Sequence, residues 1–370
     1  MILKKLQIRN FRNYDKLNIS LSPTTTIIYG DNGQGKTNLL ESIYVLAFTK
    51  SHRSFLDKSL IKNDKDTAII KGTILTDVSY NLEIILNRNK KQVKIDNNSI
   101  TKIANYIEKM NIIIFYSDDL ELLKGSPSER RKYLNLELSQ ISPNYYNTIS
   151  DYNKLLKIRN DYLKQISSGE MIDQNYFNVL TDYIVEKSIF IYQMRYKYIE
   201  KLNKICPDIF KDITGLDGFS IVYKPSINLK TLTSEEIREK IKKEYTDNLD
   251  REIKLGSTMY GPHHDDFEFS LNKEDLKNYG SQGQQRVAVL ALKLSEIKIL
   301  KDYKKTSPII LLDDVFSELD KDKKNNLLKF IDNDMQVVIT TTDLFNIDKN
   351  LINKSKLIEI KNGKVQKEVR

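Results

Sequence analysis

The segment "TTIIYGDNGQGKTNLLESIYVLAF", residues 25–48, decides the fold. A short β-rich run covers residues 25–29, and apolar residues return at helical spacing after Thr37. The sequence "GDNGQGKT" between them, residues 30–37, matches the pattern G-x-x-x-x-G-K-[ST]. A strand, a glycine-rich turn and a helix in this order predict a phosphate-binding loop in an α/β domain.

The chemistry of this loop follows from its residue types. Glycines let backbone N–H groups turn inward around phosphate oxygens, and a helix N-terminus adds positive potential. We expect Lys36 to reach the β- and γ-phosphates and serve catalysis, and the Thr37 hydroxyl to ligate Mg²⁺. The cofactors predicted are therefore ATP and Mg²⁺. The residues expected to bind the nucleotide are Gly30, Asp31, Asn32, Gly33, Gln34, Gly35, Lys36, Thr37 and Asn38.

A second apolar stretch, "IILLDD" at residues 309–314, ends in two carboxylates. Four apolar residues before Asp313 predict a buried strand, and ligands of open α/β sheets bind at the carboxyl ends of strands. We therefore expect Asp313 to coordinate Mg²⁺. Asp314 is predicted to orient or deprotonate the attacking water as a catalytic residue. Its alternative role is charge support for the magnesium shell.

Composition limits the classes of protein that remain. The net charge is +9 with a pI near 9.1, which favours polyanionic partners, although a general bias toward Lys, Asn, Ile and Tyr gives the same charge. The single cysteine, Cys206, excludes a disulfide framework and a multi-cysteine zinc site. The N-terminus has no signal-peptide pattern, and no apolar run is long enough to span a membrane. We expect a cytoplasmic, nucleoid-associated protein.

The order of patterns predicts the domain organisation. Buried strands and helices occupy both ends of the chain, including an apolar run at residues 111–116. Between them, "SPSE" at residues 126–129 has the form of a capping box, and a helical pattern then continues to about Cys206. We therefore predict an α/β ATPase head formed by residues 1–120 and 210–370. Residues 121–209 are predicted to be an inserted helical lobe.

The segment "YGSQGQQR", residues 279–286, stands at the start of an apolar helix. Its three glutamines are expected to bury nothing and to cap little, so they need another explanation. The segment resembles the signature motif of ABC-type ATPases, which contacts the γ-phosphate held by a second subunit. The resemblance implies nucleotide contacts from Ser281, Gln282, Gly283 and Gln284. "SELD", residues 317–320, resembles the loop of that family that crosses between subunits. The site is then completed only in a dimer.

The spacing of the motifs narrows the resemblance. Lys36 and Ser281 are 245 positions apart (281 − 36), which is the plan of the SMC-like branch rather than of transporter ATPases. "RNFRNY" (9–14), "KGSPSERRKYL" (124–134) and "GPHHDD" (261–266), together with the motifs above, resemble the RecF family.

Membership of that family implies a DNA-binding, weak ATPase that dimerises with ATP on double-stranded DNA near single-strand gaps. It implies help in loading the recombinase RecA, with RecR and RecO as partners. The processes implied are recombinational repair, replication restart and SOS induction. The alternatives are an ATPase subunit of a transporter, which the motif spacing opposes, and a structural SMC-like clamp, which the short insertion without heptads opposes.

Several residues keep two interpretations. The RecF family usually has arginine where this chain has His264, so any phosphate or carboxylate contact there is in doubt, and a metal site at residues 263–266 is disfavoured. Arg12 and Arg53 are candidates for nucleotide phosphate or for an ion pair with a carboxylate. The basic hairpin tip around Lys90 and Lys91 is a candidate for DNA backbone or a solvated turn.

Overall fold

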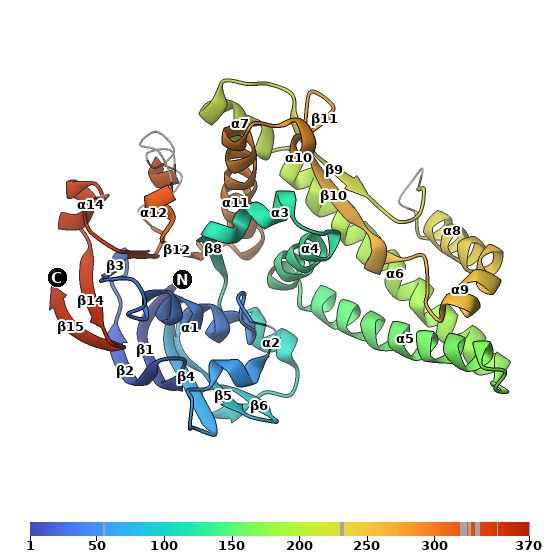
Figure 1. Ribbon diagram of the computed structural model, residues 1–370, viewed down its shortest axis with the longest axis horizontal. Helices are drawn as coiled ribbons and strands as arrows, with labels where there is room; N and C mark the ends of the chain where they lie inside the picture. The colour runs from blue at the N-terminus through green and yellow to red at the C-terminus, as the bar shows by residue number, and fades with distance from the viewer. Residues whose placement is uncertain are drawn as a thin grey trace. The chain divides into compact units, whose positions relative to one another are not determined.

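The chain forms two compact units, which we describe separately. The computed structural model describes residues 1–54, 56–229, 233–318, 324, 327–329, 334–345 and 347–369. The head unit consists of residues 1–119 and 296–370, and the lobe unit of residues 120–295. Figure 1 labels the elements used below, except β7 and β13.

The head unit begins with strands and one long helix. Its N-terminal elements are β1 Ile2–Phe11, β2 Tyr14–Ser20, β3 Thr25–Tyr29, α1 Lys36–Phe48, β4 Thr67–Leu75, β5 Ser79–Asn87, β6 Lys91–Ile95, β7 Asn98–Ser99, α2 Ile103–Ile107 and β8 Ile112–Tyr116. Its C-terminal elements are β12 Ile309–Asp313, α12 Val315–Glu318, β13 Val337–Thr341, α14 Lys349–Asn353, β14 Lys356–Lys361 and β15 Lys364–Val369.

Two six-stranded sheets make up the head unit. One is an antiparallel sheet in the order β2-β1-β4-β5-β6-β7. The other has the order β15-β14-β3-β13-β12-β8, in which every pair is parallel except β15 with β14. Strand β3 from the N-terminal part thus lies between β14 and β13 from the C-terminal part. Figure 1 shows β3, in blue, beside β14, in red. The prediction of one α/β head built from both chain ends is confirmed.

Two central strands of the parallel sheet, β12 and β13, are buried because their sequences are apolar on both faces. All five residues of β12 and of β13 are buried, as continuous Val, Ile and Leu runs predict for a parallel strand with covered faces. Helix α1 is buried from Leu39 to Phe48, on every side of the helix. It contacts β13 of the parallel sheet and β4 of the antiparallel sheet, so it forms the core between the two.

The lobe unit is mainly helical, with one small sheet. Its elements are α3 Glu121–Lys124, α4 Pro127–Ile141, α5 Pro143–Ser167, α6 Gln174–Asn203, α7 Cys206–Thr214, β9 Phe219–Lys224, α8 Ser234–Asp247, α9 Leu249–Leu255, β10 Asp266–Leu271, β11 Glu274–Asp275, α10 Leu276–Tyr279 and α11 Gln282–Lys304, whose last turns lie in the head unit. The sheet is antiparallel in the order β11-β10-β9.

Residues 210–295 group with the helices rather than with the head unit. The strand patterns that resume after the helical insertion predict that this stretch belongs to the ATPase head. In the structure β9 contacts α6 and α7, and β10 contacts α4, so the small sheet buries its apolar residues on the lobe helices. Apolar strand patterns report that a strand is buried without indicating which core receives it.

Two helix predictions differ in detail from the structure. Ser126 precedes α4 as expected, but its hydroxyl contacts Ser128 Oγ at 2.7 Å and caps no backbone N–H group. Helix α8, expected to be exposed, buries Ile237, Ile241 and Tyr245 along one stripe. These residues recur every four positions among many charges, which is the spacing of a half-buried helix.

Candidate nucleotide-binding site

The glycine-rich loop connects β3 to α1 in the predicted way. Gly30, Gly33 and Gly35 have φ of 145°, 77° and 111°, conformations that side chains rarely adopt. A Cβ atom on Gly30 would overlap the carbonyl oxygen of Ile360 in β14, and one on Gly35 would lie 2.5 Å from Asn13 Nδ2. The loop therefore needs glycine both for its turn and for its close neighbours.

Lys36 closes the loop over itself. Its Nζ atom donates to the carbonyl oxygens of Gly30, at 2.7 Å, and of Asp31, at 2.8 Å. Burial lowers the pKa of Lys36 below its usual value, while the carboxylates of Asp314, Asp313 and Asp31 act in the opposite direction. The ammonium group thus stands where the loop and both carboxylates of the second motif meet.

Thr37 and Asp313 lie together although 276 positions separate them. Strand β12 is joined to β3 through β13, so its carboxyl end opens at the same edge of the sheet. Thr37 Oγ1 donates to Asp313 Oδ1 at 3.0 Å, and Thr340 Oγ1 donates to the same oxygen at 2.6 Å. Burial raises the pKa of Asp313, and the two threonine hydrogen bonds only partly oppose it. A hydroxyl and a carboxylate at the mouth of a glycine loop suit Mg²⁺, which favours oxygen ligands.

Asp314 follows in a strained conformation. Its φ of 54° lies in the left-handed region, and its backbone N–H is held by Thr340, at 3.2 Å to the carbonyl oxygen and 3.0 Å to Oγ1. A left-handed non-glycine residue persists only where its surroundings impose it. The two carboxylates are close enough for the charge of Asp314 to raise the pKa of Asp313. The role of Asp314 in catalysis stays a prediction.

The remaining loop residues divide into exposed and anchored ones. Asp31, Asn32 and Gly33 form the exposed tip of the loop. The Gln34 side chain turns toward the C-terminus of the chain, where its Oε1 accepts the N–H of Asn362 at 2.7 Å. Asn38 Nδ2 donates to Asn13 Oδ1 at 3.0 Å. No sequence pattern predicts these two contacts, because the partners, Asn362 and Asn13, are ordinary turn residues.

The glutamine-rich segment caps its own helix, contrary to the expectation from sequence. Ser281 Oγ accepts the backbone N–H of Gln284 at 3.3 Å, and Gln284 Oε1 accepts the backbone N–H of Ser281 at 2.8 Å. This reciprocal pair is a capping box. Gln285 is buried and donates to the carbonyl oxygens of Leu276 and Lys277. Two of the three glutamines therefore have local structural partners.

The capping box leaves the outer side of this segment exposed. Ser281, Gln282 and Gly283 are all exposed, and a serine oxygen that accepts one hydrogen bond still has its own proton to donate. Contact between these residues and a nucleotide of another subunit stays a prediction. The predicted crossing loop at residues 317–320 lies outside the described residues, apart from the backbone of 317 and 318.

Arg12 is paired with a buried carboxylate rather than directed to solvent. Its guanidinium donates to both oxygens of Glu41, at 2.9 and 2.7 Å, and the Glu41 side chain is fully buried. Burial raises the pKa of Glu41, but hydrogen bonds from Arg12 and Ser51 outweigh it, so the pKa lies below its usual value. Arg53 lies 3.7 Å from the same carboxylate and donates to Asn38 Oδ1 at 3.1 Å. For Arg12 the ion-pair interpretation is thus the one that the structure favours.

The segment at residues 261–266 holds ion pairs of the lobe unit. Asp265 accepts a hydrogen bond from Arg195 at 2.6 Å, and Asp266 accepts two from Arg130 at 2.6 and 2.9 Å. Arg195 and Asp265 are fully buried. Sequence reasoning missed this role, because nothing near Asp265 or Asp266 reveals their arginine partners, 70 and 136 positions away.

The two neighbouring histidines share one acceptor. Nε2 of His263 and Nε2 of His264 each lie within hydrogen-bond distance of the Thr258 carbonyl oxygen, at 3.1 and 3.2 Å. Burial lowers the pKa of His263 to about 3, so its ring is neutral and Nδ1 accepts the Tyr152 hydroxyl at 2.6 Å. Among the described residues no group of three or more His, Cys, Asp or Glu side chains is placed to hold a metal ion.

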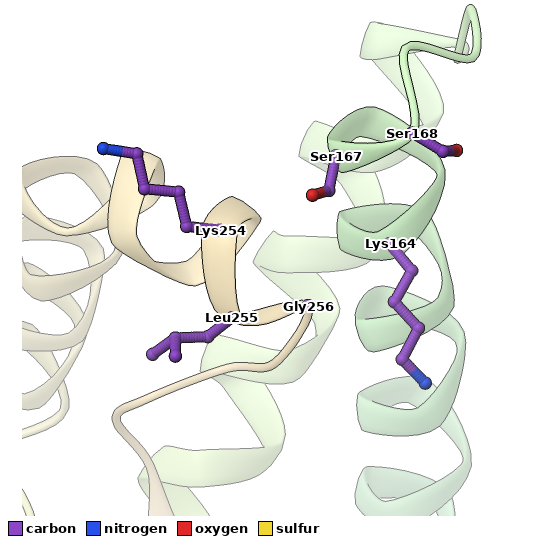
Figure 2. Close-up of a pocket in the computed structure, with 6 residues that line it drawn as sticks. All are labelled: Lys164, Ser167, Ser168, Lys254, Leu255 and Gly256. Atoms are coloured by element: carbon purple, nitrogen blue, oxygen red, sulfur yellow. The ribbon is translucent and has the colours of Figure 1, made fainter.

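Two further surface features carry lysine side chains, and contact between the first of them and DNA stays a prediction. At the β5–β6 hairpin, Lys91 is held by Asp57, at 2.7 Å, and by the Thr49 carbonyl, which leaves Lys90 as the exposed lysine of the tip. A shallow pocket at the ends of α5 and α9 is shown in Figure 2. Its lysine side chains, Lys164 and Lys254, extend away from each other there, and both helices present carboxyl ends, which disfavour an anion.

No described helix is long and apolar enough to cross a membrane.

The fold and the site together define a P-loop protein whose head unit is assembled from both ends of the chain. A family model described as the RecF/RecN/SMC N terminal domain matches residues 2–365, and the chain belongs to this family.

Its relatives are RecF proteins over their full length. The chain is 38% identical over 371 residues to the DNA replication and repair protein RecF of Ligilactobacillus salivarius (strain UCC118), covering all of this chain and 98% of that protein. It is 38% identical over 372 residues to RecF of Bacillus thuringiensis (strain Al Hakam), covering all of this chain and 99% of that protein. The predicted resemblance to RecF is therefore confirmed.

Two solved structures of known proteins are similar in fold to this chain. The structure of the recombination mediator protein RecF with ATP in the RecFOR pathway is 32% identical, with a TM-score of 0.92 over all of this chain and 97% of that one. An Smc head bound to the C-winged helix domain of ScpA has a TM-score of 0.54 over all of this chain and 97% of that one, at 15% identity, which shows the fold alone. The predicted fold class, an ABC-type P-loop head with a helical lobe, is confirmed at the level of RecF and SMC heads.

Proposed function

We propose that this protein is a DNA-binding ATPase that dimerises with ATP on double-stranded DNA near single-strand gaps and assists recombinase loading in recombinational repair, replication restart and SOS induction. The observation that carries the proposal is the contact between Thr37 and Asp313, at 3.0 Å, beside the glycine loop. Two short motifs at opposite ends of the chain meet there in the arrangement that Mg²⁺ and a nucleotide triphosphate require. A solved structure of a RecF protein with the same fold is described as a complex with ATP, which supports ATP as the ligand here.

The residues of the site fit the proposed cofactors. Backbone N–H groups of the loop from Gly30 to Gly35 would surround the β- and γ-phosphates, and Lys36 would exchange its carbonyl partners for phosphate oxygens. Mg²⁺ would bind Thr37 and Asp313 and balance the negative charge of the phosphates. Asp314 would then accept a proton from the attacking water, as a general base. Hydrolysis at this site is proposed to be slow and to release the dimer from DNA.

Dimerisation is the second part of the proposal. Ser281 and Gly283 are exposed at the start of α11, where a hydroxyl, backbone N–H groups and the helix N-terminus can bind an anion. We propose that they contact the γ-phosphate held by the partner subunit. Membership of the RecF family supports this arrangement, and it supports RecR, RecO and RecA as functional partners.

The decisive experiment is analytical ultracentrifugation with ATP, ADP or no nucleotide, each with and without duplex DNA. We expect a dimer only with ATP, and DNA binding that weakens steeply between about 50 and 200 mM salt but varies little with base sequence. Lys36→Met is the control that should abolish ATP-driven dimerisation. A monomer under all six conditions, or salt-independent DNA binding, would contradict the proposal.

A further inference from the structure

The phosphate loop is held from outside by two turns that the proposed reaction does not otherwise use. One is the turn between β1 and β2, which contains Asn13. The other is the turn between β14 and β15, formed by Asn362 and Gly363, 328 positions after Gln34 in the chain. Both contact the same residue of the loop, Gln34.

The Gln34 carbonyl group is gripped by both turns at once. It accepts the Gly363 backbone N–H at 3.1 Å and Asn13 Nδ2 at 3.2 Å. The Gln34 side chain adds a third bond, because its Oε1 accepts the Asn362 backbone N–H at 2.7 Å. Asn362 and Gly363 have φ of 51° and 67°, the left-handed pair of a tight hairpin turn, which directs two successive N–H groups to one partner.

The amide of Asn13 is itself fixed in orientation. Its Oδ1 accepts Asn38 Nδ2 at 3.0 Å, so its NH₂ group must face the loop. The next residue holds the following peptide group, since the buried Tyr14 hydroxyl donates to the Gly35 carbonyl at 2.9 Å. Two consecutive carbonyl groups of the loop are therefore held by Asn13 and Tyr14, and the second also accepts the Leu39 N–H of α1 at 2.9 Å.

The geometry of the peptide group explains how these hydrogen bonds orient the N–H groups that would bind phosphate. In a planar trans peptide the C=O of one residue and the N–H of the next point in opposite directions. Fixing the Gln34 carbonyl toward Asn13 and Gly363 turns the Gly35 N–H to the opposite side of the loop. Fixing the Gly35 carbonyl does the same for the N–H of Lys36. Successive N–H groups on one side form the concave site that binds phosphate oxygens.

We propose that Asn13 and the Asn362–Gly363 turn are positioning residues that keep the phosphate loop in its anion-binding form before the nucleotide arrives. The inference rests on the proposed nucleotide binding. Without the grip, the glycines flanking Gln34, which readily change φ, would sample other conformations, and ligand binding would have to restrict them again. Part of the affinity for phosphate is thus supplied by the last strands of the chain.

The test measures phosphate binding and folding separately in three variants. Asn13→Ala removes one donor to the Gln34 carbonyl, Asn13→Asp replaces that donor by an acceptor, and Gln34→Ala removes the acceptor of the Asn362 N–H. The matched control is Asn10→Asp, since Asn10 also lies in β1 and donates its side-chain amide to a backbone carbonyl, that of Thr67 at 3.2 Å, away from the loop. Binding is followed by fluorescence with MANT-ADP, and by competition with pyrophosphate, which has no base or sugar.

For Asn13→Ala and Gln34→Ala we expect binding of MANT-ADP and of pyrophosphate to weaken by the same factor, about threefold to tenfold, as loss of one hydrogen bond predicts. Asn13→Asp should weaken it further, and Asn10→Asp should bind like the wild type. Melting temperatures without nucleotide should stay near the wild-type value. Equal weakening for pyrophosphate separates loop positioning from any effect on the base.

Each outcome decides between the two proposals. If the wild type binds neither ligand, the proposed function fails. If the wild type binds and both folded alanine variants bind within twofold of it, the positioning role is refuted. Should Asn13→Ala fold poorly, Gln34→Ala decides alone, because its side chain is partly exposed and its loss opens no core cavity.

Discussion

Asp313 is a buried carboxylate whose ionised form, the form that the proposed Mg²⁺ contact needs, is disfavoured by burial. Burial, the largest cause, raises its pKa, and the nearby Asp314 carboxylate adds to this, while hydrogen bonds from Thr340 and Thr37 and the charge of Arg53 lower the pKa by less. A raised pKa means that the ionised form is less favourable in the folded than in the unfolded chain. A bound cation would offset this cost by favouring the ionised carboxylate.

Asp313→Asn separates the two effects. The amide oxygen can still accept from Thr37 and Thr340, so without nucleotide the variant should melt at the same or a higher temperature than the wild type. Because the folded pKa is raised, the ionised carboxylate costs stability above the usual range near 3.8, and the advantage of Asn should be larger at pH 7 than at pH 4. Magnesium-dependent stabilisation by ATP should be lost. A large destabilisation at pH 7 would show that the charge itself supports the fold.

Asp314→Asn distinguishes the two roles given to Asp314. The variant keeps the side-chain shape, and asparagine tolerates the left-handed backbone at this position. If Asp314 is the general base, turnover should fall by about 10²- to 10⁴-fold while Mg²⁺-ATP binding and dimerisation persist, and the dimer should stay on DNA longer. Single-turnover hydrolysis and nucleotide titration give the two values. Loss of Mg²⁺-ATP binding would instead place Asp314 in the magnesium shell.

At the scale of elements, helix α1 connects the site to the core. It begins at Lys36 in the phosphate loop and contacts both sheets of the head unit along its length. Gly72 in β4 allows this close packing: a Cβ atom there would overlap Leu46 Cδ2 of α1 and lie 2.8 Å from Leu3 Cδ1 of β1. The position of the phosphate loop thus depends on the absence of a side chain at Gly72, which lies in the antiparallel sheet.

Gly72→Ala should destabilise the protein by about 1 to 3 kcal/mol, because overpacking forces neighbouring side chains out of favourable rotamers. Leu46→Ala alone should also destabilise it, by leaving a cavity. Combined, the two substitutions should cost less than their sum, because the new methyl group occupies space that the leucine vacates. Chemical denaturation gives the free energy of unfolding of the two single variants and of the double variant. Strict additivity would mean that Gly72 and Leu46 do not interact.

At the scale of the whole molecule, the motifs of the proposed site belong to different units. The phosphate loop, Thr37 and Asp313 lie in the head unit, whereas Ser281 to Gln284 lie in the lobe unit. The capping box of Ser281 and Gln284 stabilises the start of α11 without any nucleotide. The same residues can therefore have a structural role in the monomer and a binding role in a dimer.

Ser281→Arg tests whether they do. The arginine places a bulky side chain at the exposed segment, so the monomer should bind ATP like the wild type but fail to dimerise or hydrolyse it. Ser281→Ala is the matched control for the cap: it removes the acceptor of the Gln284 N–H and should cost about 1 kcal/mol of stability. Equilibrium dialysis at monomer concentration reports nucleotide binding, and sedimentation reports dimerisation. Loss of ATP binding by the Ser281→Arg monomer would mean that the segment serves its own nucleotide site.

The sequence by itself determined the parts that depend on short-range chemistry. The glycines of residues 30–35, followed by a lysine, predict a phosphate-binding turn. The run "IILLDD" at 309–314 predicts a strand that is buried on both faces and has a carboxylate at its end. Both predictions hold in the structure, and the order of the motifs identified the family. The spacing of Ser281 and Gln284 also has the form of a capping box, but this local structure was not predicted from the sequence.

Only the tertiary structure decided which distant residues meet. Arg12 with Glu41, Arg195 with Asp265, and Gln34 with Asn362 are ordinary polar residues whose partners lie 29, 70 and 328 positions away. It also placed the strands of residues 210–295 with the lobe helices. The physical reason is that a hydrogen bond or a buried face requires a partner of the right chemistry but does not encode its position. The order of strands in the sheets and the packing of the helices supply that position.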